Sequence, residues 1–218
     1  MSNAHLKNAS ATTERLMRAY YRHCQAPDLD TLFGIIEASH SANDRLKKAV
    51  GTDFLDIPEF LALKCLRNFF HHHDELRHEI RVVPTVGLPI QTDLLFMCLA
   101  PRDLIDNALS QVPDRFRAQT RQASEAVFHW YGAVVNINPC LFNFVVHAYE
   151  RLQAAEVPLA GPEVDQFRKS YDFESANGYS HLIDGRISTA AGRVDALLSA
   201  LMGSIEHLPD DMPPDHSG

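Results

Sequence analysis

Residues 57–80 read IPEFLALKCLRNFFHHHDELRHEI, and this stretch decides the fold class. Large apolar side chains recur along it every three or four residues: Phe60, Leu63, Leu66 and Phe70. That spacing places them on one face of an α-helix. Pro58 stands in the expected first turn, where its missing N–H removes no hydrogen bond. We therefore predict a buried helix that continues through the histidines to the end of the stretch.

The rest of the chain shows the same helical spacing. Helices are expected at about residues 12–26, 28–51, 101–111, 113–135, 138–152 and 188–204. Asp28 is a suitable N-cap and Gly51 a suitable C-cap for the second of these, and Asn138-Pro139 is a typical helix start. The prediction is an all-α fold, a helical bundle forming one domain over residues 11–205. A flexible N-terminus (1–10) and a disordered acidic tail (206–218) are expected to flank it.

Residues 82–101 break the helical pattern. Two prolines and a glycine stand among β-branched residues in the first part of this segment. This composition predicts an irregular extended insertion, in which a short strand or hairpin could cover a face of the core. The apolar run from Leu94 to Ala100 could resume the helix.

Composition and charge limit the classes of function. The net charge of −8 counts against broad, non-specific binding of nucleic acid, which usually requires a basic face. The longest apolar run is far shorter than the ~20 residues that cross a bilayer, and the first residues do not resemble a signal peptide. The four cysteines lack the paired spacing of a disulfide framework or zinc site, so reduced, mostly buried thiols are expected. These features predict a cytoplasmic protein without membrane contact.

The end of the decisive stretch also carries reactive side chains. Metal-free RNA cleavage needs a group that exchanges protons near neutral pH, for which histidine is suited. It also needs a cation to stabilise charge that develops on the phosphate, for which arginine is suited. Asn68 and His72 are four residues apart and share a helix face, so the amide could orient the imidazole. Arg67 lies ~140° around the axis from His72, so a single straight helix brings them together poorly. A partner protomer on a two-fold axis would supply a second copy of each residue.

The pattern Arg67-Asn68-x-x-x-His72 resembles the Arg–polar–x-x-x-His motif of the HEPN superfamily. The resemblance implies a helical, usually dimeric protein and, in many members, a metal-independent endoribonuclease of a toxin–antitoxin or anti-phage system. It also implies that Arg67 and His72 are the catalytic pair, that Asn68 orients it, and that two protomers pool their motifs in one cleft. RNA would be the substrate, no cofactor or metal would be required, and an antitoxin or other regulatory protein would be a further partner.

Other interpretations of the same segment stay open. A metal could bind at the pairs His71–Glu75 or Asp74–His78, with a third ligand from elsewhere in the chain. Candidates for that third ligand are His40, His129 and His147. Alternatively, the cluster is a solvated helix end in which Arg67 pairs with an acid such as Glu37.

A non-catalytic helical binding module for a protein or nucleotide partner is the alternative function, and the acidic charge favours it. The basic run Arg45-Leu46-Lys47-Lys48 could help to hold RNA or could be an ordinary solvated face.

Overall fold

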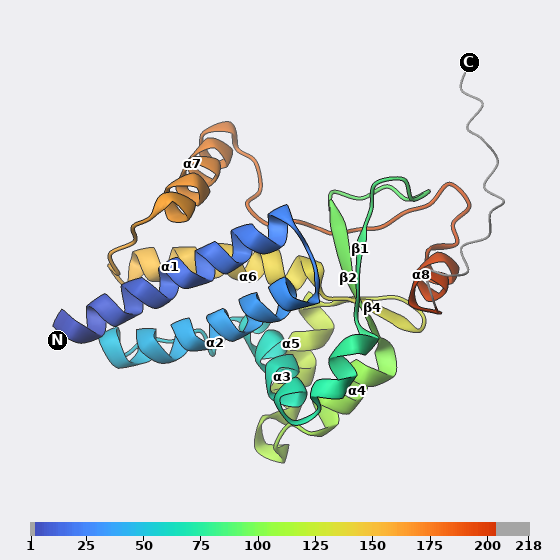
Figure 1. Ribbon diagram of the computed structural model, residues 1–218, viewed down its shortest axis with the longest axis horizontal. Helices are drawn as coiled ribbons and strands as arrows, with labels where there is room; N and C mark the ends of the chain where they lie inside the picture. The colour runs from blue at the N-terminus through green and yellow to red at the C-terminus, as the bar shows by residue number, and fades with distance from the viewer. Residues whose placement is uncertain (1–2, 204–218) are drawn as a thin grey trace.

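The computed structural model describes residues 3–203 and shows a mainly helical protein with one small sheet (Figure 1). The N-terminal half contains α1 (Asn3–Gln25), α2 (Leu29–Val50), α3 (Pro58–His72), the 3-10 helix η1 (Asp74–Glu79), β1 (Arg81–Pro84) and β2 (Phe96–Pro101). The C-terminal half contains α4 (Arg102–Ser110), α5 (Asp114–Val127), β3 (His129–Trp130), β4 (Val134–Asn136), α6 (Asn138–Ala154), α7 (Pro162–Asn177) and α8 (Val194–Gly203).

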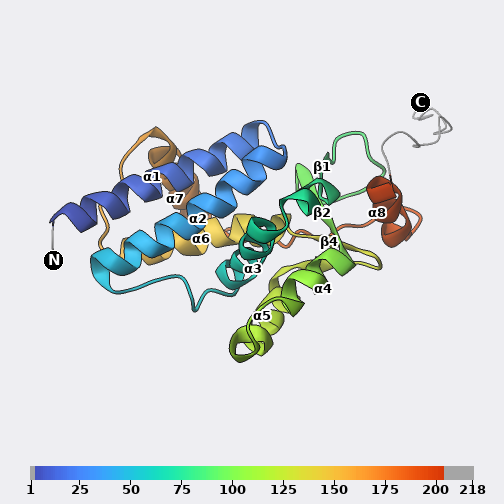
Figure 2. The same cartoon turned by 60° about the horizontal axis from the view of Figure 1, so that its bottom comes forward.

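The helices form two groups that meet at α3. The long antiparallel pair α1 and α2 lies beside α6 and α7, whereas α3 packs on α4 and α5 at the side of the molecule (Figures 1 and 2). The sheet and α8 lie at the end far from the N-terminus (Figure 2). None of the helices in residues 3–203 combines the length and apolarity that crossing a membrane requires.

The expected predominance of helices is confirmed, but the fold is not all-α, because four antiparallel strands form a small sheet in the order β1-β2-β4-β3. The apolar run from Leu94 to Ala100 belongs to its central strand rather than to a helix. Phe96, Cys98 and Ala100 join the main core under the helices, while Met97 and Leu99 join a smaller core under α8. Alternate residues of a strand point to opposite faces of a sheet. A strand covered on both faces is apolar throughout, and its pattern cannot be told from that of a buried helix.

For the insertion expected at residues 82–101, the prediction that a hairpin covers a face of the core is confirmed. Strand β1 pairs with β2 in the register Arg81↔Leu99 to Pro84↔Phe96. The helix expected at 113–135 is too long, because α5 ends at Val127 and the chain turns back through β3 and β4. Helix α7 lacks a counterpart among the predicted helices, although Val164, Phe167 and Tyr171 have helical spacing.

Both predicted caps of α2 are confirmed. The Asp28 carboxylate accepts a hydrogen bond from the Thr31 N–H at 2.7 Å, and Gly51 adopts the left-handed conformation with φ 80°. The expected flexible N-terminus is wrong for residues 3–10, which begin α1. Ala9 is buried there and Leu6 packs against the main core, so this end of α1 has its own apolar face. The expected acidic tail at 206–218 lies outside the described residues.

A buried polar cluster fastens the sheet to the helices. The Asn136 side-chain oxygen accepts the backbone N–H groups of Cys98, at 3.1 Å, and of Asn138, at 3.2 Å. The Asn138 amide donates to the carbonyl of Phe96 at 2.6 Å, so it holds β2 instead of capping α6. His23 of α1 is fully buried beside them, with Nδ1 2.9 Å from Thr31 Oγ1 and Nε2 3.7 Å from Cys98 Sγ. These bonds satisfy buried backbone groups of the strand, as expected, whereas the buried Nδ2 of Asn136 has no hydrogen-bond partner among the described residues.

Burial of His23 makes stability depend on pH. Desolvation lowers the pKa of His23 from 6.5 to about 4, opposed weakly by the charge of Asp28. Between these two values the unfolded chain binds a proton that the folded chain refuses, so stability falls as the pH is lowered. We predict that moving from pH 7 to pH 5 removes about 2 kcal/mol more unfolding free energy from the wild type than from His23→Gln, measured by urea denaturation. Equal losses in the two proteins would contradict a buried neutral imidazole.

Candidate functional site

Helix α3 has one buried side and one more exposed side, and the motif residues lie on the more exposed side. Phe60, Leu63, Leu66 and Phe70 are buried, whereas Arg67 is half-buried and Asn68 is exposed. The helix ends at His72, and His73 leaves the helical conformation with φ −139° and ψ 58°. The continuous helix expected up to Ile80 is therefore wrong, since η1 follows this break.

The Arg67 side chain is held in place by two acceptors. Its Nε donates to Glu37 Oε1 of α2 at 3.1 Å, and its Nη1 donates to Asn68 Oδ1 at 3.5 Å. The expected pairing of Arg67 with Glu37 is thus confirmed. Within residues 3–203, Nη2 of this guanidinium has no hydrogen-bond partner. Arginine in this state keeps a free donor for an additional anion.

Arg67 lies on the wall of an open cleft of about 390 Å³ between α2, α3 and η1, hereafter the motif cleft. Arg77 and His71 also line it, together with the carboxylates of Asp30, Glu37 and Asp74. Arg77 donates to Asp74 at 2.9 Å and stacks over the Phe33 ring at 4.1 Å from its centroid. The cleft therefore has two arginines whose positions are fixed by neighbouring groups.

The two histidines at the end of α3 differ in position. His71 is four residues from Arg67 and lines the motif cleft, as expected for neighbours on one helix face. His72 is exposed, does not line the cleft, and has its ring 5.5 Å from the ring of His71. Both Asn68 and His72 lie in the described part of the chain, yet no hydrogen bond joins them. Within one chain, the structure thus brings Arg67 to Asn68 and His71 but not to His72.

The metal-binding interpretation has no complete ligand set in residues 3–203. No group of three or more His, Cys, Asp or Glu side chains there is arranged to hold an ion. Of the expected third ligands, His40 faces Asp44 and His147 faces Glu59 and Glu150. Three of the four cysteines are buried and all are free, as expected.

A second polar cluster was not predicted from the sequence. At the end of α7, His181 Nδ1 lies 2.7 Å from Glu174 Oε2, and its Nε2 lies 3.0 Å from Ser175 Oγ. Its order of groups is that of a hydrolytic triad. The backbone groups at a helix C-terminus are carbonyls, however, and they would repel an oxyanion. The local Glu-Ser-x5-His spacing could have revealed the cluster had α7 been predicted.

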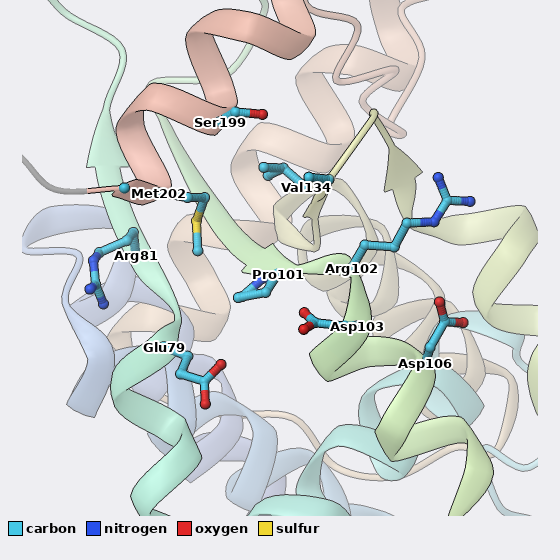
Figure 3. Close-up of a pocket in the computed structure, with 11 residues that line it drawn as sticks. Glu79, Arg81, Pro101, Arg102, Asp103, Asp106, Val134, Ser199 and Met202 are labelled. Atoms are coloured by element: carbon cyan, nitrogen blue, oxygen red, sulfur yellow. The ribbon is translucent and has the colours of Figure 1, made fainter.

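Another cavity, of about 640 Å³, lies between β1, α4 and α8 and is shown in Figure 3. The side chains of Glu79, Asp103 and Asp106 give it three carboxylates against Arg81 and Arg102. The Arg102 side chain points away from the other labelled residues (Figure 3). Its guanidinium lies over the Trp130 ring, 5.3 Å from the ring centroid. The motif cleft has the same balance of three carboxylates and two arginines, so charge does not distinguish the two. The motif cleft is the stronger candidate site because it contains Arg67, whose Nη2 has no partner among residues 3–203.

Comparison with protein-family models, with curated proteins and with solved structures gave no match. The function is therefore inferred from the residues of this chain.

The ion pair at the motif cleft should position Arg67 without stabilising the fold strongly. The Glu37 side chain is 55% exposed, and pairs in such surroundings contribute about 0–1 kcal/mol. We predict that Glu37→Gln lowers the unfolding free energy by less than about 1 kcal/mol in urea denaturation. Phe70→Ala, which removes a buried ring from the floor of the same cleft, should cost about 3–5 kcal/mol. A large loss in Glu37→Gln would show that the pair is structural.

Proposed function

We propose that this protein is a metal-independent endoribonuclease of the HEPN type that acts as a homodimer. The observation that carries the proposal is the state of Arg67. Its guanidinium is positioned by Glu37 and Asn68 on the wall of an open cleft, and it retains an N–H group for a phosphate oxygen. Positioned cations of this kind stabilise charge that develops in a transition state.

The proposed reaction needs only groups of the motif and of the RNA. The 2′-hydroxyl oxygen attacks the adjacent phosphorus, and His72 accepts the hydroxyl proton. Arg67 stabilises the additional negative charge on the phosphate oxygens. The bond to the 5′-oxygen of the next nucleotide then breaks, and that oxygen takes up the proton that His72 had accepted. The products are a 2′,3′-cyclic phosphate and a 5′-hydroxyl end.

The position of His72 outside the motif cleft of its own chain supports a site that is shared between two protomers. A two-fold axis near the end of α3 would place the exposed His72 of one protomer over the cleft of its partner. Asn68 would then fix Arg67, which it contacts, rather than His72, which it does not contact.

The biological setting is proposed from the resemblance alone. A toxin or anti-phage ribonuclease must be restrained in its host, so an antitoxin or other regulatory protein would be its partner. The alternative, a non-catalytic module that binds a protein or nucleotide on the same face, predicts a folded protein without cleavage.

The first test is cleavage of a mixed RNA pool in EDTA. Removing His72 deletes the proton acceptor, and general acid–base catalysis typically contributes about 10²–10⁴-fold. We predict that His72→Ala and Arg67→Ala each reduce the cleavage rate at least ~100-fold. His71→Ala is the matched control, because it removes the neighbouring exposed imidazole, and it should keep most activity. Circular dichroism checks that each variant folds.

The outcomes separate the interpretations. If His71→Ala abolishes cleavage and His72→Ala does not, the single-chain pair of Arg67 and His71 is the active one. Absence of cleavage by the folded wild type would favour the binding module.

The shared site predicts complementation between inactive variants. Arg67→Ala and His72→Ala are mixed, unfolded and refolded together so that protomers exchange. Each heterodimer then has one site with an intact Arg67 and an intact His72, from different chains. Because half of the dimers are heterodimers, about a quarter of the wild-type activity should return. If the mixture stays as inactive as its components, the two residues do not come from different protomers.

A further inference from the structure

Helix α1 carries a row of arginines that the proposed motif does not use. Arg15, Arg18 and Arg22 are three and four residues apart, so they share one face of the helix, and all three are exposed. Arg18 lies 3.9 Å from Glu163, a long contact between partly exposed groups. In the part of the chain that the structure describes, Arg15 and Arg22 form no salt bridge. The row therefore keeps at least two charges without an acidic partner, in a chain whose net charge is −8.

The arginine row lines a groove of about 450 Å³ between α1 and α2, hereafter the arginine groove. Glu37 is the single acid on its lining, and this carboxylate already pairs with Arg67. Gly34 and Glu37 line both the arginine groove and the motif cleft. The two depressions therefore meet over α2, whose long antiparallel contact with α1 is visible in both overall views (Figures 1 and 2).

Gly34 supplies an independent observation. It lies inside α2, where glycine is less favourable than alanine by about 0.5–1 kcal/mol. A Cβ atom at this position would meet nothing within 4 Å, so close packing does not require glycine here. The missing side chain leaves the ridge between the arginine groove and the motif cleft low. A ligand that passes from the arginine groove to the motif cleft would need such a low ridge.

We infer that the arginine groove binds the phosphate backbone of a single RNA strand and leads it over Gly34 into the motif cleft. Guanidinium groups bind phosphate oxygens with a matching fork of donors. The row spans two turns of helix, ~10 Å, so it can contact successive phosphates. Packed helices have axes only ~8–10 Å apart, so the groove between α1 and α2 is narrow, and we expect it to take a single strand rather than a duplex. The naming of RNA as ligand depends on the proposed function, whereas the site itself depends on the groove and its charge.

The test measures binding without cleavage. A fluorescent single-stranded 2′-O-methyl RNA lacks the attacking hydroxyl, and its anisotropy with the full chain gives the Kd at several salt concentrations. The triple variant Arg15→Gln/Arg18→Gln/Arg22→Gln should bind at least ~10-fold more weakly at low salt. Its slope of log K against log salt should be smaller by about 2, because each lost phosphate contact of a single strand contributes ~0.7.

Matched controls separate the site from overall charge. Arg115→Gln/Arg186→Gln/Arg193→Gln makes the same charge change at exposed arginines outside the groove and should bind like the wild type. Gly34→Gln should keep or raise the unfolding free energy, since glutamine favours helix, yet weaken binding by obstructing the ridge.

The inference is overturned if the groove triple variant binds like the wild type or if both triple variants weaken binding equally. Tighter binding of a 2′-O-methyl duplex, or equally tight binding of a polyglutamate peptide, would also overturn it. The last result would indicate a site for acidic proteins. Loss of binding in the groove variant with no cleavage by the wild type would reject the ribonuclease and keep the groove. Cleavage that depends on Arg67 and His72, with binding unaffected in the groove variant, would reject the groove and keep the ribonuclease.

Discussion

Burial of β2 on both of its faces is the constraint on which the rest of the structure depends. One side of this strand completes the main core of the helices, and the other forms a smaller core with α8. Its backbone must then be satisfied inside the protein, which neighbouring strands and the side chains of Asn136 and Asn138 accomplish. The closely packed polar cluster around His23 extends this anchoring to α1. A sheet that is fixed in this way determines where each helix group can lie.

The geometry of the candidate site follows from the packing of the helices around β2. The buried face of α3 fixes the rotation of the helix, so that Arg67 is directed to α2 and meets Glu37. The break at His73 sets the positions of the two preceding histidines, of which His71 faces the cleft. His72 is exposed beside the cleft, where the proposed homodimer requires it to be free for a second protomer. The same rotation of α1 that buries Leu16 exposes the arginine row beside the motif cleft.

Much of the helical framework could be predicted from sequence, because 3.6-residue spacing and capping residues are local signals. Asp28 and Gly51 delimit α2 correctly, and Glu37, suggested as one acid that Arg67 could meet, pairs with Arg67 in the structure. The sheet could not be predicted in the same way, since β2 is apolar at consecutive positions and lacks the alternation of a half-exposed strand. The position of His72 outside the motif cleft was not predicted, although the four-residue spacing of Arg67 and His71 is a local signal for a shared helix face. The position of His72 depends on where α3 ends and on the neighbouring η1, which tertiary packing decides.

The most direct measurement of the central claim is the chemical identity of the ends produced from a defined oligonucleotide. The substrate is one RNA strand of known sequence, compared with copies in which single positions carry 2′-deoxyribose, and the products are analysed by mass spectrometry. The account predicts 2′,3′-cyclic phosphate and 5′-hydroxyl ends, no cleavage after a 2′-deoxy position, and no products from Arg67→Ala. Products with 3′-hydroxyl and 5′-phosphate ends, or cleavage after a 2′-deoxy position, would contradict it, because neither can arise from attack by the neighbouring 2′-hydroxyl.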